Sequence, residues 1–160
     1  MVRRSVNLIP KAPVSVMVDL AVTAEQLGFE RCWVYDEGLA TRDVHITMAA
    51  ILLATNRLKV GPGVTNAYTR HPGQTAAAIA SLDELSGGRA FLGLGAGGSL
   101  TLDPLAIGRD RPLETVRQAI VACRSLFAGA TVDMDGPGFS LRAASLDYGR
   151  PDIEIWLAGR

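Results

Sequence analysis

Residues 58–72, LKVGPGVTNAYTRHP, contain the pattern that indicates the fold. The stretch opens as a short apolar strand at residues 58–60. It then passes into Gly-Pro-Gly at residues 61–63, where glycine removes side-chain bulk and permits backbone conformations that other residues avoid. A polar loop follows, and Pro72 suits the first turn of a helix because its φ is fixed and its missing N–H is not needed there. This order predicts a strand–loop–helix unit with a functional site where the strand ends. A tight turn without function is the alternative that the turn alone leaves open.

The same alternation of strand and helix runs along the whole chain. Expected strands lie at residues 5–9, 31–35, 58–60, 89–94 and 153–157. Expected helices lie at residues 15–27, 43–56, 72–86 and 112–127. Strict alternation predicts an α/β fold with a parallel sheet and right-handed crossovers, either doubly wound or part of a (β/α)8 barrel. An antiparallel ribbon is expected at residues 133–141, turning at Asp135-Gly136.

Apolar residues at helical spacing predict which face of each helix is buried. The expected stripe of the first helix is Val16, Leu20, Ala21, Ala24 and Leu27. The expected stripe of the second helix is Ile46, Ala49, Ala50, Leu53 and Ala54, with Asp43 as its N-terminal cap. In the third helix either Leu82 or Leu85 completes the stripe, and Asp83 is expected in a structural ion pair near Arg89.

Composition restricts the class of partner. The chain has 160 residues, of which 48% are hydrophobic, with 16 basic and 16 acidic side chains. This is one domain with a real core. Zero net charge without blocks of like charge argues against nucleic acid and against a basic membrane patch, since both need a localised positive field. No stretch approaches the roughly 20 apolar residues of a membrane span, and the N-terminus lacks the apolar core of a secretory signal. We therefore expect a cytoplasmic protein with a small-molecule partner.

The cysteines and histidines do not indicate a metal site. Cys32 and Cys123 lie far apart in apolar contexts, which predicts buried thiols in a reducing compartment. With two histidines in the chain and no ligand-like spacing, we expect no metal.

Polar residues and glycines at strand ends are the candidate site residues. Asp36 and Glu37 end the second strand, where a carboxylate faces the mouth of a barrel and can act as a general acid or accept a hydrogen bond. Asp36 is the catalytic candidate, Glu37 could take its place, and either could be merely solvated. His71, beside Arg70, could offer a proton or bind an anion, or it could be a structural histidine at a helix start.

A glycine-rich turn follows the fourth strand. Residues 93–98, GLGAGG, formally match the dinucleotide fingerprint G-x-G-x-x-G. The next expected helix begins well downstream, and no acid for a ribose follows at the usual spacing. This context favours a turn that lets a ligand approach the backbone over a Rossmann site.

Taken together, residues 60–98 resemble the bacterial luciferase-like superfamily. The resemblance is nearer to the branch that uses the deazaflavin coenzyme F420, typified by methylenetetrahydromethanopterin reductase. The segments WVYDEGL at residues 33–39, TLDPLAIGRDRP at residues 101–112 and IEIWLAG at residues 153–159 extend it over nearly the whole chain.

The resemblance implies a TIM-type (β/α)8 barrel. The chain would supply about the first five strands and four helices, as a single domain at residues 1–160 that is truncated at its C-terminus. The third strand would end in a bulge with a non-prolyl cis peptide, by position Gly63–Val64, supporting the central ring of the coenzyme. Asp36 would lie near that ring. The cofactor-binding residues implied by the resemblance are Gly63, Val64, Thr65, Asn66, Gly95, Ala96 and Gly97.

Two positions depart from the reductases of that branch. Asn7 stands where they carry an acid in the first strand, and Gly98 stands where they carry one after the glycines of the fourth strand. In those reductases both acids belong to the pterin and proton-handling part of the site. An amide and a glycine cannot supply these charges, so another electrophilic or alcohol substrate becomes an alternative. Asn7 and His71 are the expected substrate-side residues.

The sequence therefore leads to three functional hypotheses. The first is an F420-dependent oxidoreductase that transfers hydride between the deazaflavin C5 and a small organic substrate. The second is an FMN-dependent luciferase-like monooxygenase. The third is a truncated half-barrel without catalysis. The resemblance also implies a homo-oligomer.

Overall fold

The computed structural model describes residues 4–159 and contains one parallel sheet in two hydrogen-bonded parts. The first part joins β1 (Ser5–Leu8), β2 (Arg31–Val34) and β3 (Lys59–Pro62) in that order. The second joins β4 (Thr65–Asn66), β5 (Leu92–Gly95) and β8 (Ile155–Leu157). A parallel bridge between Val60 and Ala90 connects the two parts. The predicted order of five parallel strands is confirmed, with β4 continuing the third strand beyond residues 63–64.

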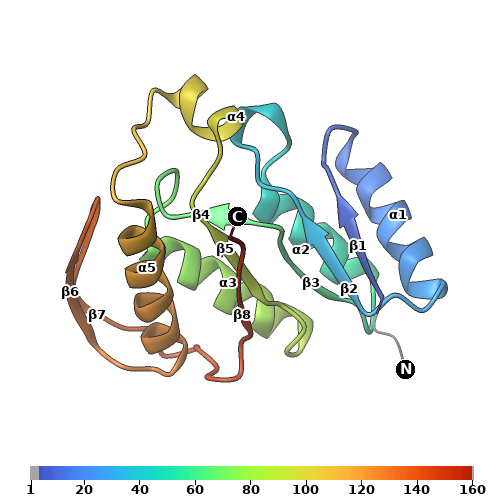
Figure 1. The fold of residues 1–160 in the computed structure, drawn as a ribbon. Coiled ribbons are helices and arrows are strands. Elements are labelled where there is room, and N and C mark those ends of the chain that lie inside the picture. Colours follow the sequence, from blue (N-terminus) through green and yellow to red (C-terminus); the bar gives the residue numbers. More distant parts are fainter. Residues whose placement is uncertain (1–3, 160) are drawn as a thin grey trace.

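Four long helices connect these strands on one side of the sheet. They are α1 (Val14–Gln26), α2 (Val44–Ala54), α3 (Pro72–Ser86) and α5 (Pro112–Phe127). Figure 1 shows them side by side, with the carboxyl ends of β1 and β2 at the top. The short helices α4 (Ser99–Leu102), η1 (Gly38–Ala40) and η2 (Asp103–Leu105) were not expected from the sequence, and α4 lies at this upper edge. No described helix is long and apolar enough to cross a membrane.

The helix ends follow the local sequence signals. Asp43 Oδ1 accepts the backbone N–H groups of His45 (2.9 Å) and Ile46 (3.0 Å), which confirms the cap predicted for α2. Pro72 stands in the first turn of α3, and Gly87 ends that helix with φ +65°.

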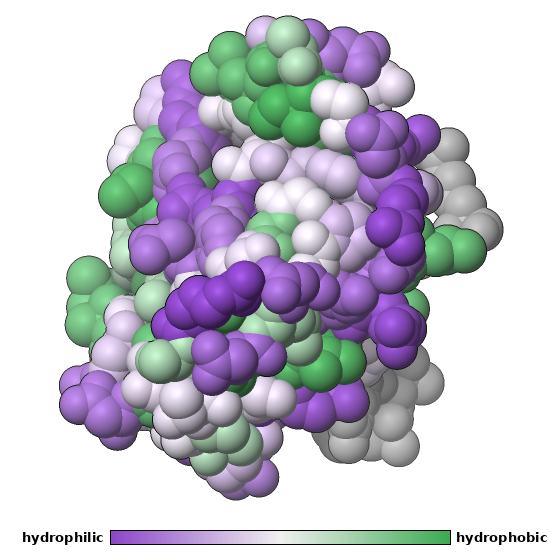
Figure 2. Space-filling model, turned by 90° about the vertical axis from the view of Figure 1, so that its left-hand side faces the viewer, coloured by the Kyte–Doolittle hydropathy of each residue, from purple (hydrophilic) through white to green (hydrophobic). Residues whose placement is uncertain are grey.

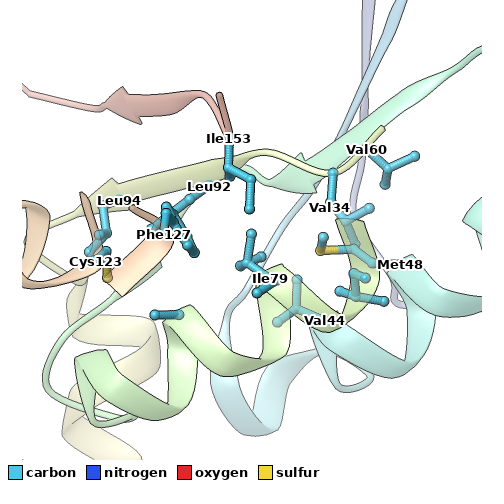
Figure 3. Packing of buried hydrophobic residues seen from close by; sticks show 14 of the residues in the cluster. Val34, Val44, Met48, Val60, Ile79, Leu92, Leu94, Cys123, Phe127 and Ile153 are labelled. Carbon is cyan, nitrogen blue, oxygen red and sulfur yellow. The ribbon is translucent and has the colours of Figure 1, made fainter. Parts of the chain in front are cut away.

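The core lies between the sheet and the helices. Figure 3 shows strand residues such as Val34, Val60 and Leu92 facing the side chains of Met48 and Ile79 from the helices. Cys123 and Phe127 of α5 close the same cluster. Cys32 and Cys123 are both free and fully buried, as predicted, and burial raises the pKa of each thiol to about 12.

The buried faces of two helices differ from the predicted stripes. In α2, Ile46 and Leu53 are 64% and 69% exposed, whereas the buried face carries Met48 and Ile51. This helix is apolar around its whole circumference, so periodicity could not select the face that packs on the sheet. In α1 the prediction is confirmed for Ala21 and Ala24 but is wrong for the three larger residues of the stripe. The exposed residues there are Val16, Leu20 and Leu27, and the buried ones are Met17, Ala21, Ala24 and Glu25.

The ribbon after α5 forms as predicted but turns at a different position. It consists of β6 (Val132–Gly136) and β7 (Phe139–Ala144), paired in antiparallel register. The turn is Pro137-Gly138 rather than Asp135-Gly136, because Gly138 adopts φ +79° while Asp135 and Gly136 pair with β7. Figure 2 looks onto the side that carries this ribbon and α5 in Figure 1. Hydrophilic and neutral residues cover most of it.

Two ion-pair details depart from expectation. Asp83 is 3% exposed and accepts from Arg150 Nε at 2.8 Å, so its partner is not Arg89. Arg89 instead donates to the carbonyls of Leu52 (2.8 Å) and Leu58 (3.1 Å), since its side chain extends toward the α2–β3 connection.

Of the two leucines that the sequence left open in α3, Leu82 is buried and Leu85 is 52% exposed.

Glu25 joins the end of α1 to the start of the third strand. Its buried carboxylate accepts the backbone N–H groups of Asn56 (3.0 Å), Arg57 (2.7 Å) and Leu58 (2.8 Å). Burial alone would raise the pKa of Glu25, but these three hydrogen bonds favour the charged form and leave the pKa below its usual value.

We expect Glu25→Gln to lower the free energy of unfolding by about 1.5–3 kcal/mol, because charge-assisted hydrogen bonds are lost. The difference from the parent chain should shrink as the pH falls below 4.5, since a carboxyl with a lowered folded pKa loses its contribution when it is protonated. Urea unfolding between pH 3 and 7 measures both effects. Glu84→Gln, in the exposed last turn of α3, is the matched control, and an equal loss in both variants would contradict the role of Glu25.

Candidate active site

A hollow of about 220 Å³ lies beside the carboxyl ends of the parallel strands, since several of its lining residues directly follow β2, β3 and β8. Its lining residues are Asn7, Trp33, Tyr35, Gly63, Val64, Trp156, Leu157 and Ala158. Asn7, Trp33 and Gly61 stand in register on β1, β2 and β3, which brings three distant segments to one level of the sheet. Of the predicted site residues, Asn7, Gly63 and Val64 therefore come together at this hollow.

The turn at Gly63–Val64 has the cis peptide expected at that position. The turn can approach the neighbouring strands closely because glycine has no side chain. A Cβ on Gly63 would lie 2.7 Å from Trp33 Cβ, and a Cβ on Gly95 would lie 2.7 Å from Val64 Cγ2. Glycine at both positions thus lets the turn pack between β2 and β5, with Val64 in the wall of the hollow.

We expect Gly95→Ala to destabilise the chain by about 1–3 kcal/mol, because the added methyl group overlaps Val64 in a packed interior. Gly98→Ala is the control, since a Cβ there meets nothing within 4 Å and its φ of −117° suits any residue. Urea midpoints of the two variants measure the difference. Equal midpoints would show that the turn accommodates the methyl group.

Aromatic side chains connect the strands around the hollow. The Trp33 ring meets Phe91 edge-on with centroids 4.6 Å apart, and it meets Trp156 in the same way at 5.7 Å. Sequence reasoning missed Trp33, Tyr35 and Trp156 as lining residues. In a strand covered on both sides, apolar residues face both ways, so alternation does not indicate which of them line a site.

Charged residues cluster next to Trp156. Glu154 pairs with Arg31 Nη2 at 2.6 Å and with Lys59 Nζ, and the Arg31 guanidinium lies 5.2 Å from the Trp156 ring centroid. Burial raises the pKa of Glu154, but the hydrogen bonds from Lys59 and Arg31 outweigh it and bring the value to about 2. This carboxylate stays ionised and paired, so it is a structural group rather than a proton carrier.

Asp36, just after the end of β2, meets Thr65, the first residue of β4. Thr65 Oγ1 donates to Asp36 Oδ2 at 2.6 Å, and Thr65 is fully buried while Asp36 is half-buried. Asn66 is 2% exposed, and its Oδ1 accepts the backbone N–H groups of Tyr68 and Thr69, both at 2.9 Å. The Asp36 carboxylate thus accepts one hydrogen bond, from the Thr65 hydroxyl. The side-chain carbonyl of Asn66 fixes the start of the loop that follows β4.

The glycine turn after β5 lies beside Asn66. Gly97 adopts φ +70°, and a Cβ there would lie 3.4 Å from Asn66 Cγ and 3.1 Å from Leu102 Cδ1. Arg109 Nη1 donates to the Gly97 carbonyl at 2.9 Å. Gly95 packs against Val64, and Ala96 stands between these two glycines; none of the three lines the hollow. The turn leads into the four-residue α4, not into the long helix that a dinucleotide fingerprint requires.

His71 does not line the hollow. Its Nδ1 accepts the N–H of Gly73 at 3.1 Å, and its Nε2 lies 3.0 Å from the carbonyl oxygen of Ser140 on β7. The ring also meets Phe139 edge-on at 5.7 Å. Both ring nitrogens therefore serve the start of α3 and its contact with the ribbon, the structural alternative that the sequence left open.

Sequence reasoning also missed His45, in the first turn of α2. Its side chain is 12% exposed, and both ring nitrogens are buried without a hydrogen-bond partner among the described residues. Burial lowers the pKa of His45, and the charge of Arg70 lowers it further against the opposing charges of Asp43 and Asp36. The sequence offered one signal that could have drawn attention to His45. It stands two residues after the helix cap Asp43, in the segment that follows Asp36.

The family described as luciferase-like monooxygenase matches residues 2–160. The chain belongs to the luciferase-like monooxygenase family. The 5,10-methylenetetrahydromethanopterin reductase of Methanolobus tindarius is 39% identical to it over 155 residues, covering 97% of this chain and 47% of the reductase. The F420-dependent glucose-6-phosphate dehydrogenase of Beutenbergia cavernae is 36% identical over 146 residues, covering 84% and 43% of the two chains.

A solved structure supports the fold. The coenzyme F420 dependent tetrahydromethanopterin reductase of Methanopyrus kandleri matches with a TM-score of 0.89 at 27% identity, over 98% of this chain and 50% of that chain. This family member thus has the partial barrel expected from its sequence. It spans about half the length of the curated relatives it matches.

Proposed function

We propose that this chain forms the coenzyme-binding part of an F420-dependent oxidoreductase, similar to methylenetetrahydromethanopterin reductase, that acts on a small organic substrate. The observation that carries the proposal is the hollow at the carboxyl ends of the strands, with Gly63 and Val64 in its wall. Similarity to relatives named for this coenzyme supports the choice of F420. We place the protein in the cytoplasm, where the buried thiols Cys32 and Cys123 stay reduced.

The residues around the hollow fit a flat, largely apolar ring. Val64 offers an aliphatic surface, Trp33 and Trp156 offer aromatic ones, and Asn7 supplies an amide. Few polar groups in a mostly apolar wall are typical of small-molecule sites. When bound, F420 would supply or accept hydride at C5 of its deazaflavin ring.

The chain's own residues would hold the ring and handle the proton. Gly63 and Val64 would support the ring from behind, and Thr65 and Asn66, buried beside the turn, would keep that part of the site rigid. Asp36, held by Thr65, would accept or return the substrate proton at its carboxylate. Gly95, Ala96 and Gly97 lie outside the hollow, so they would shape its wall by packing against Val64 and Asn66 rather than contact the coenzyme.

On the substrate side, Asn7 is the predicted residue that lines the hollow. It presents a neutral amide, which can donate and accept hydrogen bonds but cannot supply charge. This favours a neutral carbonyl, imine or alcohol substrate over one that needs a carboxylate from the first strand.

Equilibrium binding of F420 and FMN to the purified full chain, followed by fluorescence beside a circular-dichroism spectrum, tests the proposal. We expect selective binding of F420. Stronger binding of FMN would instead favour the monooxygenase hypothesis that the family name suggests. A folded chain that binds neither coenzyme would overturn the proposal for this polypeptide and favour a half-barrel without catalysis.

We further expect Trp156→Ala to weaken F420 binding about three- to tenfold, because an aromatic contact of about 1 kcal/mol is lost from the wall of the hollow. Tyr148→Ala is the matched control, since Tyr148 is 41% exposed, compared with 42% for Trp156, and does not line the hollow. Equal effects in the same titration would place the coenzyme elsewhere.

A further inference from the structure

Three side chains in the wall of the hollow have free hydrogen-bonding atoms. They belong to Asn7, Trp33 and Tyr35, and none of them has a hydrogen-bond partner among residues 4–159. The side chain of Trp156 is already committed, since its Nε1 donates to Glu154 Oε2 at 3.0 Å. An indole N–H can only donate, whereas an amide and a phenol both donate and accept. The Asn7 amide and the Tyr35 phenol are therefore the two groups of the wall that can serve either kind of ligand atom.

The strands bring these two groups to the same face of the sheet. Successive side chains of a strand point to opposite faces. Val34 is fully buried in the core, so Trp33 and Tyr35 on either side of it face the hollow. Asn7 stands opposite Trp33 in the register of β1 and β2. The pairing of the two strands continues one residue further, because the Tyr35 N–H donates to the carbonyl of Leu8 at 3.0 Å.

Two such groups on neighbouring strands suit an oxygen atom better than a nitrogen atom. A carbonyl oxygen has two lone pairs and can accept from the amide N–H and the phenol O–H at once. An alcohol hydroxyl can accept from one group and donate to the other. An imine nitrogen has a single lone pair, so it would leave one of the two donors without a partner, which costs free energy in a largely apolar wall.

We propose that Tyr35 is a specificity-determining residue of the hollow, and that its phenol and the Asn7 amide together hold the oxygen of a carbonyl or alcohol substrate. This narrows the neutral substrates that Asn7 alone allows, because it disfavours imines. The catalytic meaning of the contact rests on the proposed oxidoreductase function. The oxygen contact itself needs only the residues of this chain.

Fluorine NMR of the full chain labelled with fluorotyrosine, without coenzyme, tests the contact. The chain has three tyrosines, and replacing them one at a time by phenylalanine assigns their signals. The probes are cyclopentanone and cyclopentene, which are rings of similar size with and without an oxygen. We expect cyclopentanone to shift the Tyr35 signal to saturation. The signals of Tyr68 and Tyr148 should stay in place, since the Tyr68 hydroxyl donates to the Asp110 carbonyl and neither ring lines the hollow.

Ligand-observed NMR titrations of unlabelled variants measure the size of the effect. We expect Tyr35→Phe to weaken cyclopentanone binding about three- to tenfold, the usual range for one lost hydrogen bond, and to leave cyclopentene binding unchanged. Asn7→Leu should weaken cyclopentanone binding to a similar degree, because it removes the other partner of the same oxygen. Tyr148→Phe is the matched control, since it removes a phenol hydroxyl outside the hollow and should change neither affinity.

A folded chain that does not bind cyclopentanone would overturn the proposal. So would an equal loss for both probes in Tyr35→Phe, because it would show that the ring of Tyr35 matters and its hydroxyl does not. Should Tyr35→Phe lose its circular-dichroism spectrum, the Tyr35 signal of the parent chain and the titration of Asn7→Leu decide. Because the probe experiments contain no coenzyme, the two proposals fail separately. Absent F420 binding contradicts the proposed function alone.

Discussion

The close approach of the third strand to β5 is the constraint on which the rest of the site depends. Phe91 covers Gly61 so tightly that a Cβ there would lie 2.3 Å from its ring, and a Cβ on Gly93 would lie 2.2 Å from the carbonyl oxygen of Pro62. No other residue type could occupy these positions without moving backbone or a buried ring. The approach places Val64 in the wall of the hollow and lets β4 resume pairing with β5 directly after the turn.

The polar side chains fall into two groups, those whose hydrogen bonds are satisfied within the fold and those with free hydrogen-bonding atoms. Glu25, Asp83 and Glu154 are each satisfied by several donors, so they join elements together and have no remaining chemical task. At the carboxyl ends of the strands, Asp36 has one donor and His45 has none among the described residues. In (β/α) barrels, functional groups gather at that end while the opposite end serves stability. The electrostatics of this chain follow the same division.

Local sequence patterns predicted where helices begin and end better than they predicted which face of a helix is buried. The cap Asp43, the helix start at Pro72 and the helix end at Gly87 were readable because each depends on a few neighbouring residues. The buried face of α2 was not readable, since Ile46 and Met48 are both apolar and only contact with the rest of the fold distinguishes the buried one. His71 attracted attention as a titratable group beside Arg70, yet its ring serves a cap and a contact with β7 that lies far along the chain.

The sequence by itself determined the order of parallel strands and the position of the turn at residues 63–64, because glycine, proline and helix periodicity act over a few residues. It also placed Asp36 at a strand end. Only the tertiary structure decided which side chains share the hollow, since Asn7, Trp33 and Trp156 come from strands that meet through sheet register. It alone decided that the ring nitrogens of His45, unlike those of His71, have no hydrogen-bond partner among residues 4–159, because such partners are set by contacts between distant segments.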